Sequence, residues 1–264
     1  MEPEKYSERG FMLPLISDKY AVKKDKALKP LTISYFTDPI CSTCWIFQPL
    51  LRKLELQYGE FIDVEYHMGG LLPSWEEYSK GMISNPSDAA RLWDDMAHKH
   101  HMPLDGDIWI EDPLDSSYPP SIAFKAAQIQ DSDKAISFLR RMKEMLFVEK
   151  KNINKWEHLE KAALTSGLDA ALLRKDIAGQ GHERFMEDLK HAQELGIHVF
   201  PTLIFKVDGF SRLSLRGYQP YDRIEEHIAT YVKGAKPAHI ELNVAQLFDK
   251  FNQLTESEIA FILD

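Results

Sequence analysis

Both cysteines of the chain lie in a single C-x-x-C motif, Cys41-Ser42-Thr43-Cys44. Two thiols at this spacing can cycle between a dithiol and a disulfide, or they can supply half of a four-ligand metal site. The thiolate is the reactive form, and the unpaired N–H groups at a helix N-terminus stabilise it. We therefore expect Cys41 to be an exposed, moderately activated attacking thiol and Cys44 to be a more buried resolving thiol.

Two other interpretations of the pair remain open. A metal site needs two more soft or imidazole ligands, and the chain has no second C-x-x-C. His98, His100 and His101 cluster further along, where we expect a solvated helix end rather than a metal site. Alternatively, the pair is vestigial and the protein works by binding, because a fold does not fix a function. We expect no metal and no cofactor.

The elements around the motif favour the redox interpretation. Residues 31–36 are apolar or β-prone and predict a buried strand, and Asp38-Pro39 predicts a turn after it. Cys41 would open a helix that continues toward Gly59, and residues 61–66 predict a second strand. A C-x-x-C between a strand and a helix in such a unit is typical of thioredoxin-like proteins.

A second landmark lies at residues 199–205, where Pro201 directly precedes an apolar strand. Thioredoxin-type folds place a cis-proline here beside the C-x-x-C, so we expect a cis Phe200–Pro201 bond packed next to Cys41; a trans proline at the start of the strand is the alternative. The backbone of Phe200 could then pair with an extended partner chain. Three more elements are expected: a hairpin turn at 208–209, an edge strand over 212–216 and a helix over 221–233.

The segment between Cys44 and Pro201 is far longer than one crossover connection requires. Its apolar periodicity predicts helices over 87–98, 122–127, 134–148, 154–164, 170–178 and 182–195. The tail predicts two more helices, the second after a capping box at Thr255–Glu258, and we expect it to dock proteins. The predicted organisation is an N-terminal extension (1–30), a thioredoxin-like core (31–70 and 197–234), a helical insertion (71–196) and a C-terminal helical extension (235–264).

The composition and net charge of the chain limit the classes of partner that it could bind. The chain has 264 residues, 44% hydrophobic and 28% charged, which is ordinary for a soluble globular protein. Its net charge of −9 argues against nucleic acid and against an anionic membrane surface as partners. Residues 1–25 lack the apolar core of a signal peptide, and no apolar run is long enough to span a bilayer. We expect a cytoplasmic protein whose cysteine pair is a dithiol most of the time.

Residues 38–45, the helical insertion and Phe200-Pro201-Thr202 resemble the DsbA-related thioredoxin superfamily. Within it, the chain is similar to the cytoplasmic YjbH/SpxH adaptor family of Gram-positive bacteria. The similar segments are residues 38–45, 109–130, 138–153, 201–203 and the tail 248–264. The resemblance implies an α/β thioredoxin-like fold of the DsbA type with a long helical insertion and a helical C-terminal extension.

Members of that family bind the regulator Spx and promote its degradation by the ClpXP protease. The resemblance therefore implies an Spx-type regulator and ClpXP as partners, with Trp45, Phe200, Pro201 and Thr202 as partner- or substrate-binding residues and Cys41–Cys44 optional. Some members carry further cysteines and histidines before the motif, whereas this chain has none before Cys41. That departure removes support for an additional metal or thiol sensor.

Two other families share features of the chain. A FrnE-like cytoplasmic dithiol–disulfide oxidoreductase or isomerase has the same fold, C-x-x-C and proline, and would use Cys41 in every turnover. A kappa-class glutathione transferase relative ranks last, because those proteins typically have a hydroxyl where this chain keeps a full cysteine pair.

Overall fold

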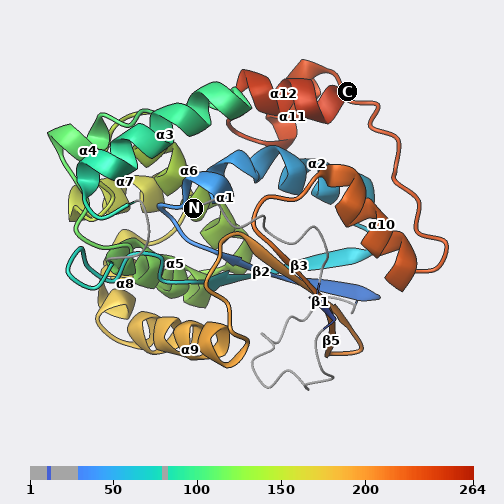
Figure 1. Cartoon of the computed structure of the whole chain (residues 1–264), viewed down its shortest axis with the longest axis horizontal. Helices are drawn as coiled ribbons and strands as arrows, with labels where there is room; N and C mark the ends of the chain where they lie inside the picture. Colours follow the sequence, from blue (N-terminus) through green and yellow to red (C-terminus); the bar gives the residue numbers. More distant parts are fainter. Residues whose placement is uncertain (1–10, 13–28, 79–82) are drawn as a thin grey trace, which may run out of the picture. The chain divides into compact units, whose positions relative to one another are not determined.

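A computed structural model describes residues 11–12, 29–78 and 83–264, shown in Figure 1. The chain divides into two units. The first combines residues 11–12 and 29–36 with residues 47–67 and 199–264. The second combines residues 37–46, which carry the C-x-x-C motif, with residues 68–198.

The first unit contains a five-stranded sheet in the order β1-β5-β4-β2-β3. The strands are β1 (Phe11–Met12), β2 (Leu31–Thr37), β3 (Ile62–Met68), β4 (Thr202–Val207) and β5 (Phe210–Arg216). Strands β4 and β5 form an antiparallel hairpin whose turn has positive φ angles at Asp208 (52°) and Gly209 (76°), so the predicted turn is confirmed. The short strand β1 pairs with β5. The prediction that β5 is an edge strand is therefore wrong.

The core of this unit lies between one face of the sheet and two helices, α2 (Gln48–Tyr58) and α10 (Tyr221–Tyr231). Alternate residues of β2, β4 and β5 point toward these helices because side chains alternate between the faces of a strand. The buried cluster includes Leu31, Ile33, Tyr35, Leu203, Phe205, Leu213 and Leu215 from the strands and Leu50, Leu54, Ile224 and Ile228 from the helices. Burial of this apolar surface is the main driving force for the unit.

The helix expected to run from Cys41 toward Gly59 is two helices, α1 (Ser42–Ile46) and α2. Phe47 lies between them in a turn, and Pro49 occupies the first turn of α2. Proline has no N–H to donate to the carbonyl of Trp45, so a continuous helix would lose a hydrogen bond at this point. The break also coincides with the passage of the chain from the second unit to the first.

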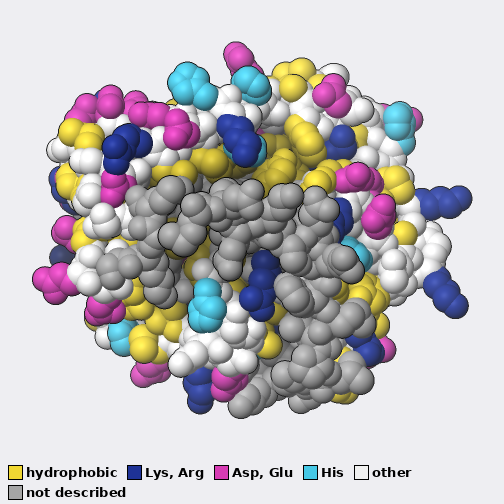
Figure 2. All heavy atoms as spheres, in the orientation of Figure 1, with side chains coloured by type: hydrophobic (Ala, Val, Ile, Leu, Met, Phe, Trp, Pro, Cys, Tyr) yellow, Lys and Arg dark blue, Asp and Glu magenta, His cyan; other side chains and the backbone are white. Residues whose placement is uncertain are grey.

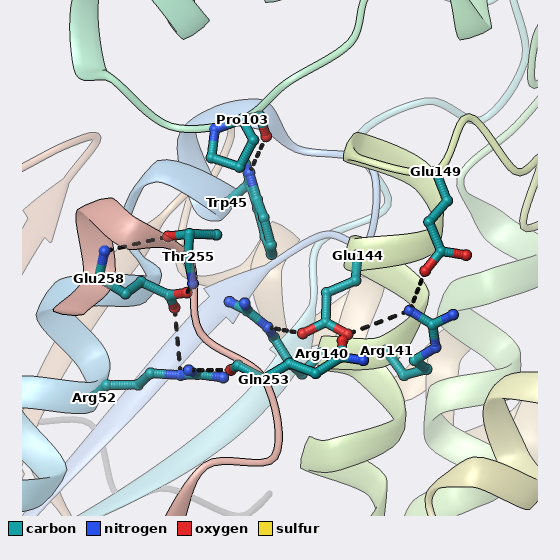
Figure 3. A network of polar contacts seen from close by, with 10 residues as sticks. All are labelled: Trp45, Arg52, Pro103, Arg140, Arg141, Glu144, Glu149, Gln253, Thr255 and Glu258. Atoms are coloured by element: carbon teal, nitrogen blue, oxygen red, sulfur yellow. Dashed lines mark hydrogen bonds and ion pairs between the residues drawn. The ribbon is translucent and has the colours of Figure 1, made fainter. Parts of the chain in front are cut away.

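The tail forms α11 (Val244–Lys250) and α12 (Glu256–Leu263), and each begins with a complete capping box. Helix α12 packs against α2 within the first unit. Arg52 of α2 donates to the carbonyl of Gln253 (2.6 Å) and lies 3.4 Å from the Glu258 carboxylate, whose side chain is fully buried (Figure 3). Lys53 donates to the carbonyl of Phe261 (2.9 Å), which caps the last turn of α12.

The second unit is built from helices. After α1 come α3 (Pro86–His100), α4 (Ile108–Glu111), α5 (Tyr118–Gln130), α6 (Ser132–Phe147), α7 (Trp156–Thr165), α8 (Ala170–Ile177) and α9 (Gln180–Glu194). Helix α5 contacts α6, α8 and α9. Small residues allow the close approach, because a Cβ added at Gly181 of α9 would lie 2.8 Å from the Cβ of Ala126 in α5. None of the helices described is long and apolar enough to cross a membrane.

A substitution at Glu258 tests the docking of the tail. Removal of one partner from a buried ion pair leaves the other charge uncompensated, at a cost of about 3 kcal/mol or more. We therefore expect Glu258→Ala to increase amide hydrogen exchange across α11 and α12 as the tail undocks from α2. Glu256→Ala, two residues earlier in α12 and exposed, is the matched control and should leave exchange unchanged. Equal protection in wild type and Glu258→Ala would contradict the role of the Arg52–Glu258 pair.

Candidate functional site

The C-x-x-C motif lies at the start of α1, as predicted. The Cys41 N–H donates to the carbonyl of Asp38 (3.3 Å), and the Cys41 carbonyl accepts from Trp45 N–H (3.0 Å) as the helix begins. The Cys44 N–H, one of the donors that a helix N-terminus leaves unpaired, donates to Cys41 Sγ (3.1 Å). Both cysteines are free thiols. The two side chains are therefore held next to each other at one helix end.

The cysteine pair is more buried than the sequence predicts. Cys41 is only 5% exposed and Cys44 is fully buried. The prediction of an exposed Cys41 is therefore wrong, because the start of α1 is covered in the folded chain. Ser42, which follows Cys41, is also buried.

The two thiols ionise differently. Burial, reinforced by the hydrogen bond to Cys44, raises the pKa of Cys41 well above its usual value. Burial also acts to raise the pKa of Cys44, but the hydrogen bond from Cys41, the charge of Lys143 and the Thr37 hydroxyl outweigh it and lower that pKa overall. The attacking role of Cys41 and the resolving role of Cys44 stay predictions.

Asp38 organises the turn that precedes Cys41, and its carboxylate is fully buried. One oxygen accepts from the N–H of Ile40 (3.0 Å), and the other accepts from the N–H of Leu71 (2.7 Å) and the hydroxyl of Ser117 (2.8 Å). Burial raises the pKa of Asp38 to about 6, although these three donors and the charge of Lys143 act to lower it. Sequence reasoning treated Asp38 only as a turn residue and missed this role.

Lys143 of α6 is a second buried charged residue of the candidate site that sequence reasoning missed. Its side chain is fully buried, and its ammonium group donates to the Thr37 hydroxyl (3.3 Å). The charge of Lys143 acts on Cys41, Cys44 and Asp38. A signal was present in the sequence: Lys143 lies four residues after Leu139 and three before Leu146, on the apolar face of the predicted helix.

Trp45 is a core residue of the second unit. Its side chain is fully buried, its indole N–H donates to the carbonyl of Pro103 (2.8 Å), and its ring stacks on Phe147 with centroids 5.4 Å apart. The Arg140 guanidinium lies 4.4 Å from the ring centroid and pairs with Glu144 at 2.5 Å (Figure 3). A partner-binding role for Trp45 stays a prediction, and its burial leaves little of the side chain exposed to a partner.

The other predicted binding residues lie in the first unit. The Phe200–Pro201 bond is cis, as predicted. Thr202, the first residue of β4, is fully buried, and its hydroxyl donates to the carbonyl of Val199 (2.7 Å). Pro201 is buried and its carbonyl accepts from Gly217 N–H (2.7 Å), whereas Phe200 is half-buried. A partner-binding role for these three residues stays a prediction.

The histidine cluster marks the end of α3. His98 and His100 lie in the last turn, and His101 ends the helix with a positive φ of 53°. His98 and His101 are exposed. Basic side chains at a helix C-terminus interact favourably with the helix dipole, which agrees with a solvated helix end.

The fold and the C-x-x-C motif define a thioredoxin-type protein of the DsbA kind. A family model described as Thioredoxin matches residues 35–226. Among solved structures, a candidate protein disulfide isomerase from Nitrosomonas europaea has a TM-score of 0.66 at 18% identity and covers 77% of this chain and 98% of its own. The cytosolic disulfide reductase DsbM from Pseudomonas aeruginosa has a TM-score of 0.56 at 22% identity and covers 76% and 94%. These likenesses concern the fold alone.

Sequence similarity identifies the family more closely. The chain is 33% identical over 250 residues to the ClpXP adapter protein SpxH of Halalkalibacterium halodurans, covering 92% of this chain and 81% of that protein. It is also 33% identical over 245 residues to the ClpXP adapter protein SpxH of Bacillus subtilis, covering 89% and 79%. The chain belongs to the SpxH (YjbH) family within the thioredoxin superfamily.

The proximity of the two thiols predicts a reversible intramolecular disulfide. After diamide treatment and alkylation in denaturant, we expect the intact mass to fall by two hydrogens with no alkyl group added. Without diamide, alkylation should be much slower in the native protein than in denaturant, because both sulfurs are buried. Cys44→Ser is the control and should keep one alkylatable thiol after diamide. Two alkylated thiols in diamide-treated wild type would contradict this expectation.

The raised pKa of Asp38 predicts a pH dependence of stability. The native state holds this proton more tightly than the unfolded state, so the stabilisation is full below the ordinary pKa of 3.8 and is lost as the pH rises through about 6. Over that window we expect the free energy of unfolding of wild type to fall relative to Asp38→Asn, by up to ~3 kcal/mol. Urea unfolding at several pH values measures the difference. The exposed Asp95→Asn variant should follow wild type, and parallel curves for wild type and Asp38→Asn would refute the assignment.

Proposed function

We propose that this chain is a cytoplasmic ClpXP adaptor that binds an Spx-type transcriptional regulator and accelerates its degradation without catalysing a reaction itself. The observation that carries the proposal is the similarity over 92% of the chain to a protein named ClpXP adapter protein SpxH. A similarity over 92% of the chain includes residues of both units and is not confined to the C-x-x-C region.

The state of the cysteine pair supports an adaptor over an enzyme. A thiol–disulfide oxidoreductase must bring its thiolate into line with a disulfide of another molecule in each turnover. Here both sulfurs are buried, and burial raises the pKa of Cys41, the thiol at the helix end. An adaptor needs only a complementary surface, so its cysteines can be dispensable.

The physical role of the adaptor would be to hold a segment of the regulator near the protease and so raise its effective concentration there. Each unit exposes large apolar side chains that could contact a partner. They are Phe210, Tyr218, Val244, Phe248 and Leu263 in the first unit and Ile110, Val148, Leu164, Leu172 and Met186 in the second. Figure 2 shows apolar side chains interspersed with charged ones on one face, with carboxylates gathered over α3 and α4.

Apolar contacts predict a modest effect of salt on partner binding, because ionic strength screens charges rather than apolar contacts. Among Phe200, Pro201 and Thr202, the half-buried Phe200 is the residue best placed to meet a partner. Its backbone would pair with an extended segment of the regulator in the manner of an added strand.

The second candidate is a FrnE-like dithiol–disulfide oxidoreductase. One observation favours it: the surroundings of Cys44 lower the pKa of that thiol, which a pair without redox chemistry does not require. In this alternative a substrate disulfide would have to reach the buried pair, and turnover would depend on both cysteines.

A reconstituted degradation assay separates the two candidates. With purified ClpXP and an Spx-type substrate, we expect this protein to shorten the half-life of the substrate several-fold. The double variant Cys41→Ser/Cys44→Ser should shorten it equally, because the adaptor role uses surface rather than thiolate chemistry. Circular dichroism of the variant checks that it is folded.

A parallel assay of disulfide reduction tests the oxidoreductase alternative. The adaptor proposal fails if the half-life of the Spx-type substrate is unchanged while the wild-type protein reduces or isomerises disulfides with multiple turnovers. Loss of that turnover in Cys41→Ser and in Cys44→Ser separately would then assign the protein as an oxidoreductase.

A further inference from the structure

Two large apolar side chains of the second unit are exposed on adjoining segments of the chain. Ile110 of α4 is 60% exposed, and Val148, directly after α6, is 46% exposed. The Asp105 N–H donates to the carbonyl of Phe147 (2.9 Å), which joins the loop before α4 to the end of α6. Exposed apolar side chains that lie close together mark interaction sites more often than scattered ones do.

An aromatic cluster holds these two segments together beneath the surface. Trp109, next to Ile110 in the chain, contacts Trp93 with ring centroids 5.2 Å apart. Trp93 in turn contacts Phe147, next to Val148, with centroids 4.6 Å apart. All three rings are buried. The two exposed side chains therefore stand on a fixed support, and a surface held in place before binding avoids part of the entropy cost of association.

Carboxylates lie beside the apolar pair. Asp105, Asp107 and Glu111 converge on the ammonium group of Lys150, with oxygens 3.9, 3.5 and 2.9 Å from its Nζ. All three acidic side chains are in contact with solvent. One ammonium group offsets only one of these three negative charges. The surface therefore keeps a negative excess, and Figure 2 shows carboxylates gathered over α3 and α4.

The backbone at Lys150 indicates that its side chain has a role here. Its φ is 50°, in the left-handed region, just after the end of α6. Glycine is the usual residue at such a position, because it adopts this conformation without steric cost. A lysine at this position is explained by the carboxylates that its side chain gathers rather than by the turn itself.

Cations on the neighbouring segments are matched by carboxylates of their own. Arg141 pairs with Glu149 (2.5 Å), and Lys155 pairs with Asp112 (2.7 Å). Lys151 also acts on Glu149. None of the described ion pairs joins these three cations to the carboxylates around Lys150. The excess of negative charge beside the apolar pair is therefore not offset by them.

We propose that Ile110 and Val148 are the centre of a docking surface for a basic, amphipathic segment of a partner protein. An apolar side chain of that segment would contact these two residues, and its lysine or arginine side chains would pair with Asp105, Asp107 and Glu111. The apolar centre would supply affinity and the charged rim would guide association. The inference goes beyond the proposed function, because it assigns a surface and the chemistry of its partner without reference to Spx or ClpXP.

The charge of this docking surface selects among the possible occupants. Nucleic acids and anionic membranes carry negative charge and would be repelled. A two-fold dimer uses the same patch on both subunits, so it would set the carboxylates of one copy against those of the other. Like charges facing each other across an interface are costly. A cationic peptide segment is the occupant that the charges favour.

The test is the binding of a fluorescein-labelled helical peptide, with leucines on one face and lysines on the other, to the full-length protein by fluorescence anisotropy. We expect Ile110→Ser and Val148→Ser each to weaken binding about fivefold, as truncation of a central interface residue does. Asp107→Asn/Glu111→Gln should weaken it by a similar factor at low ionic strength. That second effect should shrink at high ionic strength, because salt screens exposed charges.

Matched controls lie on α9, where Met186 is exposed near Glu183 and Glu187. Met186→Ser and Glu183→Gln/Glu187→Gln change apolar surface and net charge as the test variants do, and they should bind the peptide as wild type does. A peptide with glutamate in place of lysine should not bind. A peptide with serine in place of leucine should bind more weakly and lose its sensitivity to Ile110→Ser. Circular dichroism checks that each variant is folded.

Four results would overturn the proposal. They are wild type that does not bind the lysine peptide at low ionic strength, α9 variants that weaken binding as much as the test variants, equal binding of the glutamate peptide, and folded test variants that bind like wild type. Sedimentation equilibrium addresses the remaining occupant: a wild-type dimer that Ile110→Ser dissociates would assign the surface to a second copy instead. If Ile110→Ser does not fold, Val148→Ser decides the question.

Discussion

A single buried carboxylate fixes the geometry on which the candidate site depends. Asp38 is fully buried, and an unpaired carboxylate there would be costly, so its oxygens require donors. They receive three, from Ile40 in the turn, Leu71 in the segment after β3 and Ser117 at the start of α5. Ser117 also accepts from the N–H of Leu72 (3.0 Å), which ties the same segments together a second time. The position of the motif therefore follows from the need to satisfy one charge.

A second buried carboxylate in the same unit also accepts a backbone N–H group. The Asp188 carboxylate in α9 accepts from the N–H of Met68 (2.7 Å) and pairs with the buried Lys125 of α5. Met68 and Leu71 thus hydrogen-bond to carboxylates from two different segments. Buried charges add little net stability, because desolvation offsets the attraction between partners. What they contribute here is geometry, since each carboxylate accepts the backbone N–H groups of one arrangement of the chain.

The long periodic elements of this fold could be predicted from sequence, because their apolar spacing reports burial directly. The strands at 31–37 and 202–207 and the helices from α5 to α9 fall close to their predicted ranges. Features set by a single residue or by distant contacts were missed. Helix α4 has only four residues, Pro49 divides the helix after the motif, and Lys53 caps α12 from another helix. The burial of Cys41 likewise depends on residues far away in sequence, which no local pattern encodes.

The same limit applies to the ionisation of the cysteine pair. Position in a helix favours a thiolate on Cys41, because the helix end supplies local N–H donors. The structure adds burial, which acts to raise the pKa of both thiols. At Cys44 the charge of Lys143 is among the causes that act against burial and lower the pKa. A dithiol enclosed in this way is poorly placed to attack a protein disulfide, yet it can still change its charge when a small oxidant reaches it. The exposed surface that an adaptor requires lies on other residues, so partner binding and the ionisation of the pair are separable properties of one chain.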